Sequence, residues 1–142
     1  MSQISLEQAR SIITGAFAEG KRLNLKPLSV AVLDPGGHLL AFERQDGSST
    51  LRPQIASGKA AGALALGVSS RQIAAMAEDR PVFVGMLGAI AEGGLVPAAG
   101  GLIVVDVAGQ PLGAVGVTGD TSDNDELCAI AGIGAAELAY RA

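Results

Sequence analysis

Residues 28–44 read LSVAVLDPGGHLLAFER, and this stretch decides the fold class. The run of branched and aliphatic side chains from Leu28 to Leu33 predicts a buried strand. The turn sequence at 34–37 combines Asp, Pro and two Gly residues, which is typical of a tight chain reversal. A second strand is predicted from His38 to Arg44, so the stretch as a whole predicts a β-hairpin.

Helical spacing of apolar residues predicts helices on both sides of this hairpin. The first is predicted over 6–23, and its start is fixed by a capping box between Ser5 and Gln8. Asn24 and Pro27 then end it. Three more helices are predicted over 50–67, 70–77 and 82–91.

The last third of the chain predicts a second hairpin and a final helix. Its strands are predicted at 102–107 and 111–118, and the preceding stretch 95–100 is a loop or a short edge strand. The final helix is predicted over 123–140, with Asp123 and Glu126 at its cap. Its predicted buried stripe is Leu127, Ile130, Ala131, Gly134 and Leu138. Because strands and helices do not alternate singly, the order predicts an α+β fold, with helices packed on an antiparallel sheet.

Length and composition exclude several classes of protein. A chain of 142 residues predicts one domain over 1–142, and 49% hydrophobic against 17% charged residues predicts a compact globule. A net charge of −4 and a 3% aromatic content argue against nucleic-acid binding. No apolar run is long enough for a membrane span, and the N-terminus lacks a signal-peptide pattern, so we expect no membrane partner and a cytoplasmic location.

The apolar surplus also predicts self-association. The mean hydropathy is +0.39, which is high for a monomeric soluble protein. The predicted helix over 50–67 carries small residues at Ala56, Ala60 and Ala63, where another backbone can approach closely. We therefore expect a homo-oligomer, at least a dimer.

His38 and Cys128 are each the single residue of their type in the chain. His38 is the only imidazole, and two interpretations stay open: a ligand-binding or metal-ligating residue, or a solvent-facing turn residue. Cys128 cannot form an internal disulfide, and its apolar sequence neighbours predict a buried, unreactive thiol. No Gly-x-Ser-x-Gly motif is present, which argues against a serine hydrolase.

The chain has only 10 Lys and Arg residues, and four of them are candidates for binding an anion: Arg44, Arg52, Lys59 and Arg71. A guanidinium can grip a carboxylate with two parallel hydrogen bonds, and Lys59 lies two helical turns beyond Arg52. The alternative is that these cations form structural ion pairs. Their candidate partners would be Glu43, Asp46 and Asp125.

Four carboxylates gather where the last helix begins: Asp120, Asp123, Asp125 and Glu126. Carboxylates there are favoured by the helix dipole, and the spacing is not that of an EF-hand loop, so capping is favoured over cation binding. The preceding stretch 113–119 (GAVGVTG) is rich in glycine but is not a phosphate-binding loop. Its glycines predict close packing of a helix or a ligand against the strand.

We expect a pocket where three polar segments converge: the bend at 44–47, the helix start around Arg52 and Lys59, and the stretch 118–126 beginning at Thr118. Lys59 and Asp125 have apolar sequence neighbours. A buried unpaired charge is costly, so each of them should have a partner or a ligand.

Five stretches together resemble the GlcG/HbpS-like family: 30–40 (VAVLDPGGHLL), 44–47 (RQDG), 55–60 (IASGKA), 100–102 (GGL) and 113–119, with Asp125-Glu126 following. This family is also described as the haem-degrading or DUF336 domain and includes PduO C-terminal-type domains. The resemblance covers nearly the whole chain. Gln45 stands where the family usually has Met or a similar apolar residue, and Ile103 stands where it usually has Pro.

The resemblance implies a five-stranded antiparallel sheet of profilin-like or PAS-like layout, assembled into homo-oligomers such as hexamers or octamers. It also implies a small-molecule-binding protein with haem among the candidate cofactors, since the family has been linked to haem, iron, corrinoid metabolism and catabolic operons. His38 is then the candidate iron ligand. The candidate ligand contacts are His38, Arg44, Arg52, Lys59 and Thr118.

A second function stays open beside ligand binding. It is a small catabolic enzyme of the isomerase or lyase type that acts on an organic acid by proton transfer. Arg44 or Arg52 would hold the carboxylate, and Asp125 or Glu126 would serve as the base. Proton abstraction next to a carbonyl needs only a placed carboxylate and a cation that stabilises the enolate, so no catalytic triad is required.

Overall fold

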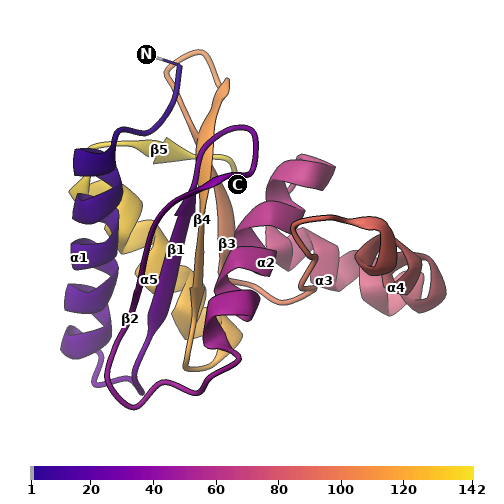
Figure 1. Cartoon of the computed structure of the whole chain (residues 1–142), viewed down its shortest axis with the longest axis horizontal. Coiled ribbons are helices and arrows are strands. Elements are labelled where there is room, and N and C mark those ends of the chain that lie inside the picture. Colours follow the sequence, from indigo (N-terminus) through magenta and orange to yellow (C-terminus); the bar gives the residue numbers. More distant parts are fainter. Residues whose placement is uncertain (1) are drawn as a thin grey trace.

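A five-stranded antiparallel sheet forms the centre of the computed structural model, which describes residues 2–142 (Figure 1). The strand order is β2-β1-β4-β3-β5, and every pairing is antiparallel. The strands are β1 (Ser29–Leu33), β2 (Leu39–Arg44), β3 (Gly101–Val105), β4 (Pro111–Thr118) and β5 (Ala139–Tyr140). The predicted α+β class and the antiparallel sheet are confirmed.

Helices cover both faces of this sheet (Figure 1). The helices α1 (Leu6–Arg22) and α5 (Ser122–Ala135) pack against each other and against one face. The other face is covered by α2 (Arg52–Leu66), which contacts β1, β3 and β4. Two short helices, α3 (Ser70–Asp79) and α4 (Pro81–Ile90), extend from α2 away from the sheet.

The main core lies between the sheet and the α1–α5 pair. Val30 and Val32 of β1 contribute to it, together with Ile12 and Ile13 of α1. The start of α1 matches the prediction, because Ser5 Oγ accepts from the backbone N–H of Gln8 and the Gln8 side chain accepts from Ser5 N–H. This capping box holds α1 in register with its apolar side toward the core.

The opposite face of the sheet is lined by small residues where α2 lies. Ala60 of α2 packs against Leu33 and Ala114. A Cβ atom added to Gly116 would collide with the backbone carbonyl oxygen of Ala56. The α2 backbone therefore sits directly on β4, and the close packing predicted from the glycines at 113–119 is confirmed for a helix.

The end of the last helix differs from the prediction. The helix α5 ends at Ala135 instead of continuing to Tyr140, and Glu137 takes a left-handed conformation with φ of 59°. The chain then reverses, and Tyr140 pairs with Val104 at the edge of the sheet. The pairing with β3 therefore overrides the helical propensity of an alanine-rich segment.

The cap and the buried face of α5 also need correction. Thr121 is the N-cap residue, and its Oγ1 accepts from Asn124 N–H, whereas Asp123 and Glu126 do not cap the helix. Of the predicted stripe, Leu127 is 48% exposed, whereas Ile130 and Leu138 are partly buried against the main core. The buried residues of α5 are instead Asp125, Cys128, Ala129, Gly132 and Ile133.

The remaining elements lie within a few residues of their predicted bounds, and the stretch 95–100 contains no strand. Ile103 is buried against Ala63 of α2 and so belongs to the packing of the sheet. Within residues 2–142, no helix is both long enough and apolar enough to span a bilayer.

Candidate functional site

The polar residues predicted to converge meet at one end of the sheet. Ser29 begins β1 and pairs with Arg44, the last residue of β2, and with Thr118, the last residue of β4. Directly paired residues of antiparallel strands point to the same face. Arg44, Ser29 and Thr118 therefore form one row on the face that α2 covers, and α2 begins next to it at Arg52.

Arg52 is tied to this row through a side-chain hydrogen bond. Its Nη1 donates to Thr118 Oγ1 at 2.7 Å, and the Thr118 side chain is buried. Within residues 2–142, neither Arg44 nor Arg52 forms an ion pair with a carboxylate. Both guanidiniums therefore have N–H groups that donate no hydrogen bond within the described residues.

Behind Arg52, Lys59 and Asp125 form a buried ion pair. Lys59 Nζ lies 3.2 Å from Asp125 Oδ2 and donates to the Val117 carbonyl oxygen at 2.9 Å. Asp125 Oδ1 accepts from Asp120 N–H at 2.9 Å. Burial lowers the pKa of Lys59 and raises the pKa of Asp125, and the charge of each partner opposes that shift in the other. Each charge thus has the partner that its apolar setting requires.

Arg71 lies in a separate, exposed ion-pair cluster. Its Nη2 contacts Asp123 Oδ1 at 2.6 Å, and its Nε contacts Glu126 Oε1 at 3.0 Å. These two carboxylates raise the pKa of Arg71. The two candidate bases are therefore both engaged, because Asp125 is enclosed with Lys59 and Glu126 is held by Arg71.

His38 lies at the other end of the sheet, in the turn between β1 and β2. The full length of β1 separates it from Arg44 and Thr118, about 13 Å at roughly 3.3 Å per strand residue. Its side chain is 81% exposed, and its Nδ1 lies 3.1 Å from Asp34 Oδ1. Asp34 Oδ1 also accepts from the backbone N–H groups of Gly36 and His38. These hydrogen bonds lower the pKa of Asp34.

A groove of about 540 Å³ opens beside His38. One wall is the C-terminal half of α2, and the other is the turn that carries His38. The lining residues are Pro35, Gly36, Gly37, His38, Ala61, Leu64, Ala65, Glu92 and Gly93. The groove therefore combines small apolar residues with a single imidazole.

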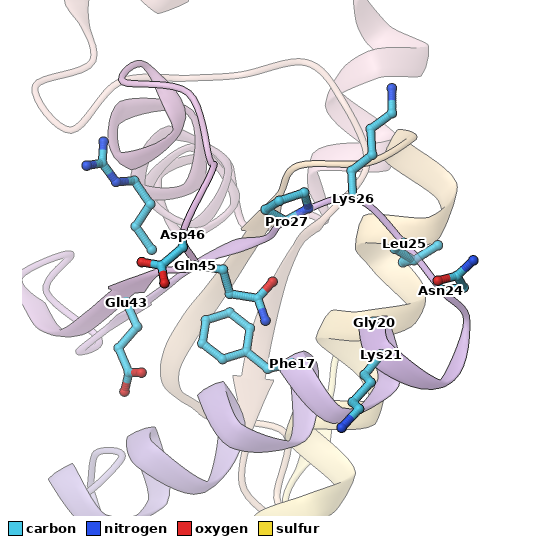
Figure 2. A pocket seen from close by; sticks show the side chains of 11 residues that line it. Phe17, Gly20, Lys21, Asn24, Leu25, Lys26, Pro27, Glu43, Gln45 and Asp46 are labelled. Carbon is cyan, nitrogen blue, oxygen red and sulfur yellow. The ribbon is translucent and has the colours of Figure 1, made fainter.

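A second groove, of about 640 Å³, lies on the opposite face, between the end of α1 and the end of β2 (Figure 2). Phe17 and Gln45 point into the same space there. The Gln45 side chain is fixed because its Oε1 accepts from Leu28 N–H at 2.7 Å. The predicted bend at 44–47 contributes Arg44, Gln45 and Asp46 to this groove, whereas Arg52, Lys59 and the stretch 118–126 do not line it. Sequence reasoning missed the part of the groove formed by Lys21 and Lys26, since no pattern joined them to that bend.

Ser29 was also missed. Its Oγ is buried and has no hydrogen-bond partner among the described residues. The available signal was one hydroxyl within the otherwise aliphatic run 28–33. Within residues 2–142, no group of three or more His, Cys, Asp and Glu side chains is placed to hold a bare metal ion.

Comparison with known proteins places this chain in a family. The family model described as haem degrading protein HbpS-like matches residues 4–134, and the chain belongs to the HbpS-like family. No protein of curated function matches the chain.

Solved structures share the fold over nearly the whole chain. A structure described as the PduOC:heme complex has a TM-score of 0.86 and 18% identity, with 99% of each chain covered. Klebsiella pneumoniae protein ORFY has a TM-score of 0.85 and 25% identity, with 96% of this chain and 92% of that chain covered. HbpS has a TM-score of 0.81 and 28% identity, with 94% and 90% covered.

Proposed function

We propose that this protein binds a haem-type iron tetrapyrrole in the groove beside His38. The observation that carries the proposal is the hydrogen bonding of the two nitrogens of the His38 imidazole. Nδ1 is engaged by Asp34, whereas Nε2 has no hydrogen-bond partner in the part of the chain that the structure describes. Membership of the HbpS-like family supports the proposal. The heme complex of PduOC, similar in fold, is consistent with it.

The donor set fits this class of ligand. A bare ion needs several protein ligands in one place, and the described residues offer no such group. A tetrapyrrole brings four nitrogen ligands of its own, so the one exposed imidazole of His38 would suffice to hold the iron. When bound, the iron would supply redox and gas-binding chemistry.

Asp34 orients the His38 imidazole and sets which ring nitrogen carries the proton. A carboxylate on Nδ1 holds the proton there, which leaves the Nε2 lone pair free and fixes the ring orientation. The lowered pKa of Asp34 keeps this carboxylate ionised near neutral pH. Ala61, Leu64 and Ala65 supply an apolar wall for a flat ring. Glu92 is the only Asp, Glu, Lys or Arg side chain among the lining residues.

Titration with hemin, followed by the Soret band, tests the proposal. We expect a saturable Soret shift that is lost in His38→Ala, and a roughly tenfold weaker affinity in Asp34→Asn, as for other carboxylates that orient a ligating His. Arg10→Gln, an exposed change on α1, is the control and should bind like the parent. The absence of a saturable band, or identical binding by parent and His38→Ala, would refute the proposal.

The proton-transfer enzyme remains a prediction from the sequence. It needs a carboxylate base that a substrate can reach, and both candidates make ion pairs within the chain. Ligand binding needs no such rearrangement, because His38 is exposed as it stands. We therefore favour binding.

A further inference from the structure

The groove shown in Figure 2 lies between two segments that carry opposite charges. One side is the end of α1 with the residues after it, where the charged side chains are Lys21 and Lys26. The other side is the end of β2 with the following turn, where Glu43 and Asp46 are the acidic side chains. Arg44 also lines this side, but strand alternation directs its side chain to the face that α2 covers. A ligand that crosses the groove would therefore meet a cation on one side and a carboxylate on the other.

These two lysines and two acidic side chains form no ion pair within the described residues. Glu19, the acidic residue nearest to Lys21 along α1, is instead paired with Arg22 at 2.7 Å. Glu43 pairs with Val30 in the sheet, and Val30 belongs to the core under α1, so the Glu43 side chain points to the α1 side. The opposite charges thus face one groove without neutralising each other.

Between the two sides, the Gln45 amide is fixed with its donors free. The backbone N–H of Gln45 donates to the Leu28 carbonyl oxygen at 2.9 Å, and Gln45 Oε1 accepts from Leu28 N–H at 2.7 Å. Because a backbone N–H needs an acceptor, the oxygen of the amide must face Leu28, which leaves the NH₂ group for the groove. Gln45 Nε2 makes no hydrogen bond within residues 2–142 and lies next to the Phe17 ring (Figure 2). This donor suits a carboxylate or carbonyl oxygen.

The Phe17 ring gives the groove an apolar floor. It is partly buried against the main core, as is Leu25 beside it in the lining. In Figure 2 the ring lies between the side chains of Lys21 and Glu43. A short chain of methylene groups laid over this ring would bury apolar area while its two ends reach the two charged sides.

We propose that this groove binds an ω-amino acid, a zwitterion whose amino and carboxylate groups are separated by a short apolar chain. Lys21 and the Gln45 amide would hold the carboxylate, and the two acidic side chains at the end of β2 would hold the ammonium group. The methylene groups would lie on Phe17. The groove is on the face of the sheet opposite the groove at His38, so this proposal does not depend on haem binding.

Saturation-transfer difference NMR of the hemin-free protein with ε-aminocaproate tests the proposal, because this method detects weak binding through the signals of the ligand. Hexanoate and hexylamine, each of which lacks one of the two charges, are the comparison ligands at equal pH and ionic strength. We expect saturable binding of ε-aminocaproate in the millimolar range. Each comparison ligand should bind about two- to fivefold more weakly, because each loses one exposed ion pair.

Two variants test the two ends of the ligand separately. Gln45→Glu keeps the acceptor for Leu28 N–H but replaces the free NH₂ group with a negative oxygen. It should therefore lose binding of ε-aminocaproate and of hexanoate while melting near the parent temperature. The double variant Glu43→Gln/Asp46→Asn removes the partners of the ammonium group, so it should bind ε-aminocaproate and hexanoate equally well.

Glu7→Gln, an exposed change at the start of α1, is the charge-matched control and should bind like the parent. His38→Ala should also bind like the parent, so this proposal and the haem proposal fail independently. If Gln45→Glu does not fold, Lys21→Gln replaces it and should bind ε-aminocaproate about two- to fivefold more weakly. The proposal is overturned by no saturable signal, by equal affinity of the parent for all three ligands, or by parent-like binding in the variants at Gln45 or Lys21.

Discussion

At the residue scale, the buried pair Lys59–Asp125 shows how two charges are accommodated between α2 and α5. Both side chains are almost fully buried, and the Val117 carbonyl and Asp120 N–H complete their hydrogen bonds. Removing one partner leaves the other charge buried and unpaired. Lys59→Met and Asp125→Asn should therefore each lower the free energy of unfolding by about 3–5 kcal/mol, measured by chemical denaturation at pH 7.

The double variant Lys59→Met/Asp125→Leu provides the control for this pair. Removing both charges together removes the unpaired charge, so the double variant should be much more stable than either single variant. If the free energy of unfolding falls in the double variant by the sum of the two single decreases, the two side chains are not coupled.

Cys128 yields a prediction about reactivity. Burial raises the pKa of its thiol to about 11, and the nearby Asp125 adds to this effect. The thiolate is the reactive form, so at pH 8 very little of the folded protein carries it. Ellman's reagent should modify Cys128 slowly in the native protein and rapidly in guanidinium chloride. Prompt stoichiometric reaction of the native protein would contradict the packing of α5 described above.

Residues that contrast with their sequence neighbours were the easiest to interpret from sequence. Lys59 and Asp125 stand out as charges among apolar residues, and both the burial and the need for a partner followed from that contrast. Ser29 gave a weaker signal, because a serine fits a strand without difficulty. Its missing hydrogen bond depends on which side chains the neighbouring strands bring beside it, and that information is not local in the sequence.

At the element scale, α5 shows where the spacing of apolar residues does not predict the buried face of a helix. The predicted buried stripe included Leu127 and Gly134, which are exposed, whereas the structure buries Cys128, Ala129 and Gly132. A Cβ atom on Gly132 would collide with the carbonyl oxygen of Ile12 in α1. The two helices pack backbone against backbone, so small residues face the partner helix. Hydrophobicity alone does not report how closely two helices approach.

The same close packing predicts the effect of adding one methyl group to β4. Gly116→Ala forces the Cβ atom against the backbone of α2, which cannot yield as a flexible side chain could. We expect a loss of at least about 1–3 kcal/mol in the free energy of unfolding, the usual range for overpacking. Thermal melting with matched protein concentrations measures it.

Gly134→Ala is the matched control, because a Cβ atom at Gly134 of α5 would meet nothing within 4 Å. Alanine is favoured over glycine in a helix by up to about 1 kcal/mol, so this variant should be neutral or more stable. Equal melting temperatures for both variants would mean that α2 does not rest on β4 as described.

For the molecule as a whole, β1 places two different chemistries at its two ends. The turn after Leu33 presents His38 and the apolar groove, whereas Ser29 at the start of the strand lies between Arg44 and Thr118. Within one chain, the two ends are too far apart for one small ligand to contact both.

The helix α4 gives the last prediction, which concerns assembly. It contains no charged residue, and Val82, Met86 and Ile90 are 82%, 62% and 71% exposed. Their spacing of four residues places them in one stripe, on a helix that extends away from the sheet (Figure 1). Burying each such side chain contributes about 1.5–3 kcal/mol. We therefore expect a second copy of this chain to cover the α4 stripe.

Light scattering at micromolar concentration should then give a mass that is a multiple of the 14.1 kDa chain. The double variant Met86→Glu/Ile90→Glu should dissociate this assembly, because two carboxylates would be buried without partners in the contact. Val107→Glu is the control, since Val107 is fully exposed in the β3–β4 turn, far from α4 in sequence. Its mass should match that of the parent. A parent mass of about one chain would exclude self-association, and an unchanged mass in the double variant would place the contact elsewhere on the molecule.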